Sequence, residues 1–342
     1  MTLTRRDLLW LGSTALAGCA ARLPGPSEGA RGVAAQAEAA LEIVDTMPAF
    51  WAFWESARGR PADEAFARFE RAVVARHPEL YTASVLGLSA EEGALRARFE
   101  PWWAALPARV TRMRAISDAL PAQLEVAAAR FVDALPAFDW RGRCYLLASL
   151  DAFNGAGRMI DGAPQLAFGV DVIADEGPSM PGPVLFSHEL FHFHQRQPEQ
   201  NVIGAGVWFE GLAVHASRVL NPGATLDEVL PEQHLHDPSD PQLLNRARAV
   251  SAERELPWYE RELAGMLLDA LESDSEQDYA TFFLGRASDA LGERPVRAAY
   301  YFGLRTAERL AARGHGLQEL SERAPEEMIP AVRATLEDIA AG

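Results

Sequence analysis

The chain has 342 residues, of which 49% are hydrophobic and 23% are charged, a composition typical of a globular protein large enough for one big core or two modest ones. The formal net charge is −16 at pH 7. Such an acidic chain would repel phosphate groups, which argues against nucleic acid or anionic lipid as a binding partner.

The first residues predict export. Arg5 and Arg6 precede an apolar segment of roughly a dozen residues, which is too short to span a bilayer as a helix and is typical of a signal peptide. The paired arginines resemble the twin-arginine signal for export of folded proteins, and Leu16–Cys19 resembles the cleavage site of bacterial lipoproteins. We therefore expect a signal peptide at residues 1–18 and a lipid on Cys19. The alternative is an amphipathic N-terminal helix that is retained.

The lipid would anchor the mature chain to the cell envelope on the periplasmic side. Residues 19–35, rich in Gly, Pro and Ala, would form a flexible tether. Ala20 stands where an aspartate would favour retention in the inner membrane, so anchoring to the outer membrane is preferred. Only Cys144 then remains, and since one cysteine cannot form an internal disulfide, we expect a buried core thiol.

Residues 36–139 are expected to form a helical N-terminal region. Apolar residues recur three and four positions apart, as in Asp63–Ala75, which is the helical period. Prolines should cut this region into several short helices. Its many aromatic residues could form a ligand cage, but at helical spacing we interpret them as core. They include Phe50, Trp51, Phe53, Trp54, Trp102 and Trp103.

Residues 140–342 are expected to contain a small sheet followed by helices. Strands are predicted at Cys144–Leu150 and Leu166–Ile173, separated by a loop at Asn154–Gly157. The predicted helices run from about Pro183 to Gln197, from about Gly206 to Leu220 and through most of residues 247–341, with a surface loop at 221–245. The predicted fold class is α+β and predominantly helical.

One apolar run, Val184–Gln195, contains three histidines and a glutamate, although buried titratable groups are costly without partners. On a helix, His188 and His192 would project from one face about one turn apart. Both rings could then reach one metal ion at about 2.0–2.1 Å, with Glu189 on the neighbouring flank. The alternative is coincidence, because His-Glu-x-x-His arises by chance in roughly one or two such chains per hundred.

Glu210 is the candidate for a third ligand. It lies in the apolar stretch Val207–Ala213, after a polar turn that could bring a second helix back antiparallel to the first. Catalytic zinc takes three protein ligands and leaves one position for water. The alternative is a capping or solvated carboxylate, which the flanking apolar residues disfavour.

These motifs resemble the gluzincin clan of zinc metallopeptidases, in which His-Glu-x-x-His lies on one helix and a glutamate on the next. The form Glu-Gly-Leu-Ala at Glu210–Ala213 is typical of several such families. One family of predicted zinc-dependent proteases also shows a helical region rich in Phe and Trp and a late Tyr-x-Gly segment, matched here by Tyr300–Gly303.

The resemblance implies a gluzincin-like core within residues 140–342, in which the two motif helices pack on each other. His188, His192 and Glu210 would hold Zn²⁺, and Glu189 would be the general base and then the proton shuttle.

The resemblance also implies a hydrogen-bond donor to the oxyanion and a strand that binds substrate. Tyr301 is the candidate donor, Tyr300 is the alternative because the phase of the helix is open, and core packing remains possible for both. The strand Leu166–Ile173 would be the edge along which an extended peptide lies.

Val214 marks a departure from the family pattern. Many gluzincins have an aspartate four positions after the ligand glutamate, where it accepts a hydrogen bond from a zinc-binding histidine. With Val214 there, the acceptor must come from elsewhere or be absent.

The remaining histidines are less informative. His194 should point away from the pair as an outer partner or a surface group, and His215 should lie off the ligand face. His234, His236 and Asp237 could bind a second metal, but flexible surface histidines are the simpler interpretation.

The sequence as a whole predicts a membrane-tethered zinc metallopeptidase that hydrolyses a peptide or protein substrate. The alternative from another class is a non-catalytic envelope lipoprotein that uses a protease scaffold to bind a protein or a cell-wall component. A third hypothesis is a zinc hydrolase that acts on something other than a peptide bond. Substrate preference, endo- or exopeptidase action and oligomeric state stay open.

Overall fold

The computed structural model describes residues 41–176, 182–230, 252–284 and 297–342. Within them the chain forms two compact units. The sheet unit contains residues 41–126 and 141–176, and the helical unit contains residues 127–140 and the described residues from 182 onward. The sheet therefore groups with the N-terminal helices, and not with the later region to which a boundary at residue 140 assigns it.

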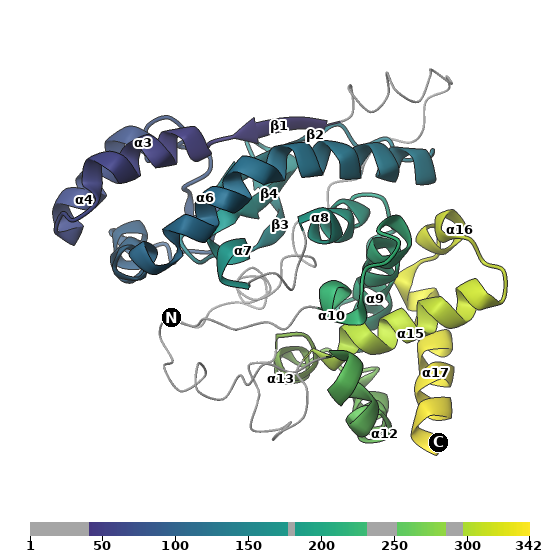
Figure 1. Cartoon of the computed structure of the whole chain (residues 1–342). Helices are drawn as coiled ribbons and strands as arrows, with labels where there is room; N and C mark the ends of the chain where they lie inside the picture. The colour runs from purple at the N-terminus through teal and green to yellow at the C-terminus, as the bar shows by residue number, and fades with distance from the viewer. Residues whose placement is uncertain (1–40, 177–181, 231–251, 285–296) are drawn as a thin grey trace. The chain divides into compact units, whose positions relative to one another are not determined.

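The sheet has four strands in the order β1-β2-β4-β3 (Figure 1). β1, β2 and β4 are parallel, and β3 is antiparallel to β4. Their bounds are Leu41–Asp45, Gly142–Leu147, Gly155–Ile160 and Ala163–Gly169 for β1 to β4. β4 is thus hydrogen-bonded on both sides, so the expectation that this strand is a sheet edge open to a peptide is wrong. The predicted α+β class, mostly helical with a small sheet, is confirmed.

Two of the predicted boundaries in the sheet differ from the structure. The predicted loop at Asn154–Gly157 is mostly the start of β3, and the chain turns instead at Asp161 and Gly162, with φ of 51° and 76°. A two-residue Asp-Gly turn with positive φ at both positions suits the twist of a hairpin. The predicted strand Leu166–Ile173 ends at Gly169, after which α7 covers Val170–Glu176.

Aromatic side chains form the core between the helices of the sheet unit, which confirms the core interpretation. Phe53 contacts Phe69 at 5.3 Å between ring centroids, and Phe99 stacks on Trp103 at 5.8 Å. Cys144 is fully buried. The helices of this unit are α3 (Met47–Ala57), α4 (Ala62–Phe69), the π-helical η1 (Glu70–Val74), α5 (Ala83–Leu86), α7 and residues 94–126 of α6 (Ala94–Ala134), whose last residues belong to the helical unit.

Helix α6 runs unbroken for 41 residues through Pro101, Pro107 and Pro121, where short helices were expected. Pro101 and Pro107 are exposed and Pro121 is half-buried, so the three rings lie away from the fully buried face of the helix. Burial of the opposite face, including Trp102 and Leu106, stabilises the helix beyond its local propensity.

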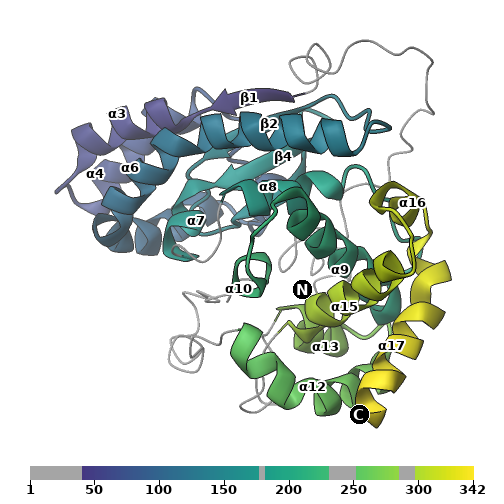
Figure 2. The same cartoon turned by 45° about the vertical axis from the view of Figure 1, so that its right-hand side comes forward.

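Helix α9 lies at the centre of the helical unit, beside α8, α15 and α17 (Figure 2). It exposes only Arg218 and Val219, as expected for a helix that is apolar on all sides. The elements are α8 (Gly182–Phe191), α9 (Ile203–Leu220), α10 (Leu226–Val229), α12 (Ala252–Ala270), α13 (Glu276–Tyr279), η3 (Ala280–Leu284), α15 (Ala298–Ala312), α16 (Leu317–Ser321), η4 (Pro325–Met328) and α17 (Ile329–Ala341).

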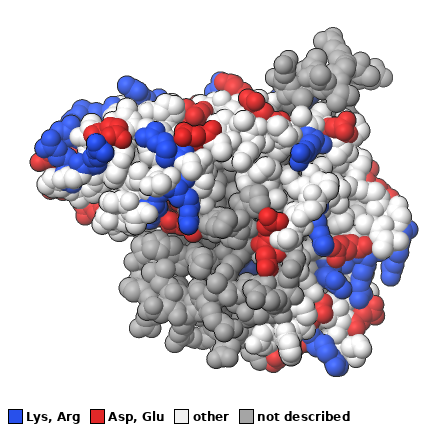
Figure 3. Space-filling view, in the orientation of Figure 1, with Lys and Arg blue, Asp and Glu red and all other residues white. Residues whose placement is uncertain are grey.

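Acidic and basic side chains are interspersed on the described surface in Figure 3. In the described part of the chain, every helix is too short or too polar to cross a membrane. The predicted signal peptide, Cys19 and the tether at 19–35 lie outside the described residues.

Candidate metal centre

The two histidines of the His-Glu-x-x-His motif lie at the C-terminal end of α8. His188 is in the helix, but α8 ends at Phe191, six residues before the expected end, and His192 is in the following turn. That turn stays close to helical, since Phe193 and His194 donate to the carbonyls of Leu190 and Phe191 at 3.0 and 2.9 Å. The two rings therefore remain on one side of the chain, with their Nε2 atoms 3.1 Å apart.

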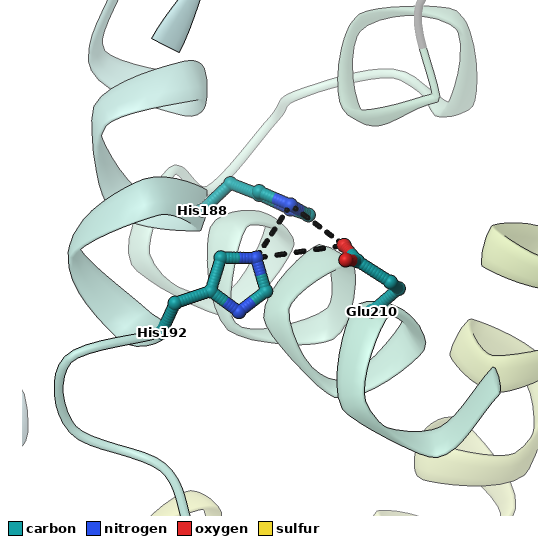
Figure 4. A group of neighbouring side chains, drawn as sticks. All are labelled: His188, His192 and Glu210. Carbon is teal, nitrogen blue, oxygen red and sulfur yellow. Dashed lines mark hydrogen bonds and ion pairs between the residues drawn. The ribbon is translucent and has the colours of Figure 1, made fainter. Parts of the chain in front are cut away.

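Glu210 brings a carboxylate from α9 to the same point, as Figure 4 shows. Its Oε2 is 3.3 Å from His188 Nε2 and 3.5 Å from His192 Nε2. One ligand atom from each residue lies within 4.8 Å of the others. This group could hold a metal ion, and two imidazoles with one carboxylate are a donor set of catalytic zinc sites.

The unsatisfied oxygen of Glu210 supports the fit of a cation. The side chain is 1% exposed, and its Oε1 is buried with no hydrogen-bond partner in the described residues. A buried carboxylate oxygen without a donor is costly. A metal ion beside the carboxylate would remove that cost.

Glu210 is ionised despite its burial. Burial alone would raise the pKa of Glu210, but the facing rings of His192 and His188 outweigh it and hold this pKa well below the usual range. The carboxylate is therefore available as a charged ligand at neutral pH.

Two side-chain amides that were not predicted from the sequence form hydrogen bonds between the α8 segment and the α9 segment. Asn221, after the end of α9, donates to Ser187 Oγ at 3.1 Å, one residue before His188. The Gln195 amide nitrogen lies 2.7 Å from His192 Nδ1 and donates to the Phe209 carbonyl at 3.0 Å. Neither contact has a sequence signal of its own, because each depends on where the chain turns after a helix.

Glu189, the expected base, is on α8 next to His188 in the chain and is 5% exposed. Val214, at the position of the family's aspartate, is buried and has no polar group to offer a histidine. The acceptor that the family pattern places there must therefore come from another residue or be absent.

The two tyrosines of the Tyr-x-Gly segment have different surroundings. The Tyr300 ring lies 6.3 Å from the His188 ring between centroids, with 30° between the planes. The Tyr301 hydroxyl donates to Glu260 on α12 at 2.6 Å. The structure thus brings Tyr300, the alternative candidate, to His188, and it directs the Tyr301 hydroxyl to α12.

Two glycines explain how this segment reaches the site. A Cβ on Gly211 would lie 2.1 Å from the backbone of Gly303, and a Cβ on Gly303 would lie 2.0 Å from the Val207 carbonyl oxygen. Helices α9 and α15 are therefore in direct backbone contact there. Gly211 follows the ligand Glu210, and Gly303 is one turn after Tyr300, so this crossing sets the distance between the two motifs.

His194 and His215 do not belong to the group formed by His188, His192 and Glu210. His194 Nε2 is 3.1 Å from Ser321 Oγ, and its ring packs against Phe131 and Phe138. His215 is buried on α9. His234, His236 and Asp237 lie outside the described residues.

Comparison with known proteins finds no match for this chain. No protein-family model matches the chain, and neither does any curated protein or solved structure. The interpretation of the site therefore depends on the sequence motifs and on the geometry described above.

Proposed function

We propose that this protein is a zinc-dependent metallopeptidase of the gluzincin type, with His188, His192 and Glu210 as the metal ligands. The main support is that two imidazole nitrogens, from α8 and its following turn, face a buried carboxylate of α9 whose second oxygen has no hydrogen-bond partner among the described residues. Bound zinc would supply a polarised water and a Lewis acid for the substrate carbonyl.

The residues around the ligands suit the chemistry of amide hydrolysis. Glu189 takes the proton of the attacking water and later gives a proton to the leaving amine. The Tyr300 hydroxyl is the candidate donor to the developing oxyanion, a contribution on the order of 3 kcal/mol. We prefer Tyr300 to Tyr301 because the Tyr300 ring lies against His188 and the Tyr301 hydroxyl is bonded to Glu260.

The proposal extends to the place of action and the substrate. The N-terminal signal and Cys19 would export the chain and tether it to the periplasmic face of the envelope, where peptides or proteins are the substrates. The net charge of −16 argues against a nucleic acid substrate.

Replacement of Glu189 by Gln separates an enzyme from a binding protein. We expect Glu189→Gln to keep its zinc and to lose on the order of 100-fold or more in cleavage of a peptide library, because the base is gone while the ligands remain. Glu199→Gln is the matched control, since Glu199 is exposed, and it should cleave like the wild type. Equal cleavage by Glu189→Gln and wild type would exclude the proposed mechanism.

A further inference from the structure

We propose that Gln195 is the residue that positions His192 for metal binding, in place of the carboxylate that the family pattern puts at the position of Val214. The inference depends on the proposed metal site and assigns this role to a residue outside both motifs. Gln195 lies in the turn after α8 and is 5% exposed.

Gln195 contacts the ring of the proposed ligand His192 and the backbone of Phe209, the residue before the proposed ligand Glu210. Its amide nitrogen is 2.7 Å from His192 Nδ1, the ring nitrogen that does not face Glu210. The same nitrogen donates to the carbonyl of Phe209, which directly precedes Glu210. A single buried amide therefore fixes the rotation of the His192 ring relative to the backbone that carries Glu210.

The proton on His192 decides which way the amide must face. A ring that binds metal through Nε2 must carry its proton on Nδ1, and that Nδ1–H needs an acceptor. The only acceptor that Gln195 offers is its carbonyl oxygen Oε1. In the metal-binding form, Oε1 must therefore face Nδ1, so the amide is turned over relative to the orientation in the structure.

The amide orientation with NH₂ toward Nδ1 suits the other tautomer of His192. With the amide NH₂ toward Nδ1, the Nδ1 lone pair accepts and the ring proton is on Nε2, which points at Glu210 Oε2 at 3.5 Å. A carboxylate could serve only the metal-binding tautomer, because it has no proton to donate. A glutamine amide carries both a donor and an acceptor and can therefore serve either tautomer, although with Oε1 toward Nδ1 it gives up its hydrogen bond to the Phe209 carbonyl.

The test is the zinc affinity of the full chain, measured by competition with a chromophoric chelator. Gln195→Met keeps the length of the side chain but removes both polar groups, and it should lower zinc affinity by about tenfold to a hundredfold. Gln195→Glu restores an acceptor for Nδ1–H and should bind zinc within about threefold of the wild type. In the cobalt-substituted protein, only Gln195→Met should change the visible absorption bands.

Gln197 provides the matched control. Its amide donates to the backbone carbonyl of His192 at 2.6 Å and so contacts the same residue without touching the ring. Gln197→Met should leave zinc affinity within about threefold of the wild type. An equal loss in Gln195→Met and Gln197→Met, or an equal loss in Gln195→Met and Gln195→Glu, would overturn the inference.

The remaining outcomes are also decisive. A wild-type chain that binds no zinc removes the proposed function, and this inference with it. A wild type and a Gln195→Met variant that bind zinc equally overturn the inference alone. If Gln195→Met does not fold, Gln195→Glu decides, because a tenfold loss of affinity in that variant contradicts the acceptor role.

Discussion

Glu210 supports, at the scale of a single residue, our proposal that the site is a ligand set and not a structural ion pair. A buried ion pair is stable only when the lone pairs of the carboxylate are satisfied, and Oε1 of Glu210 is not satisfied by any described residue. Both histidines facing Oε2 can give their lone pairs to a cation instead. The carboxylate is therefore arranged for an ion that completes its bonding.

Replacement of Glu210 should accordingly affect metal more than fold. We expect Glu210→Gln to lower zinc affinity by at least about a hundredfold, a larger loss than for a residue that only orients a ligand. The metal-free chain should lose only part of its thermal stability, because the amide oxygen of glutamine can still accept from an imidazole that faces Oε2. Zinc competition and metal-free unfolding curves together check this, and a stable variant with wild-type affinity would contradict the assignment.

His215 makes a separate prediction about acid stability. Burial, and to a smaller degree the charge of Arg218, lowers the pKa of His215 to about 4. The unfolded chain, with an ordinary His pKa near 6.5, binds this proton more readily. Stability from the neutral ring is therefore full above pH 6.5 and is lost as pH falls toward 4.

The measurement is the free energy of unfolding of metal-free protein between pH 7 and pH 4. His215→Gln should lose on the order of 1–3 kcal/mol less than the wild type over this interval, since its amide does not titrate. A His215→Gln variant with the wild-type slope would show that this ring does not control acid stability.

Residues whose role follows from local sequence spacing were predictable, whereas residues whose role depends on where a helix ends or how it is rotated were not. His188, His192 and Glu210 were identified because helical spacing fixes which side chains share a face. Gln195 was missed because its role depends on α8 ending at Phe191, and the choice between Tyr300 and Tyr301 depended on helix phase. Neither the end of a helix nor its phase follows from local pattern.

At the scale of elements, the crossing of α9 and α15 is the most constrained contact of the site. We expect Gly211→Ala to destabilise the protein by about 1–3 kcal/mol, because a Cβ 2.1 Å from Gly303 forces the two backbones apart. The same shift moves Tyr300 away from His188, so peptide cleavage should fall as well. Urea unfolding and peptide cleavage measure the two effects.

Gly265 is the matched control for this substitution. It lies inside α12, and a Cβ there would meet nothing within 4 Å. Gly265→Ala should stabilise the protein by about 0.5–1 kcal/mol, since alanine has the better helix propensity. If both alanine variants have the same stability, the close approach at Gly211 is not a constraint.

In the sheet unit, Asp171 is a buried residue on which the local structure depends. It lies in α7, at the carboxyl ends of β2 and β4. Its buried carboxylate accepts from the backbone nitrogens of Ser149 and Asp151 at 2.7 and 2.9 Å and from Trp102 Nε1 at 2.9 Å. Asp171→Asn turns one accepting oxygen into a donor, and we expect a loss of about 1–3 kcal/mol. Urea unfolding measures it, and an unchanged midpoint would contradict this role.

The elements also show where sequence pattern failed. The start of helix α9 was predicted within three residues, because a continuous apolar run with no proline favours a single uninterrupted helix. The unbroken α6, the start of α7 and strand β3 were missed because tertiary packing determines them. β1 was missed for the same reason, since it pairs with β2 about one hundred positions away in the sequence and has no local signal.

At the scale of the whole molecule, all three proposed ligands belong to the helical unit, and the sheet unit contributes none of them. Binding to the folded state stabilises only the part that forms the site. Zinc at about one hundred times its dissociation constant should add about 2.7 kcal/mol to the stability of the helical unit. Hydrogen exchange should slow in α8 and α9 on zinc addition and stay unchanged in β2 and β4, whereas equal slowing in all four would contradict this division.

The central claim is that this chain holds one zinc ion between α8 and α9, and the metal content of the purified full chain tests it most directly. The wild type and Glu189→Gln should each retain about one zinc per chain after dialysis, while His192→Ala and Glu210→Ala should retain little, as expected for three protein ligands of which each is needed. A wild type without stoichiometric zinc, or a His192→Ala variant that keeps it, would contradict the account.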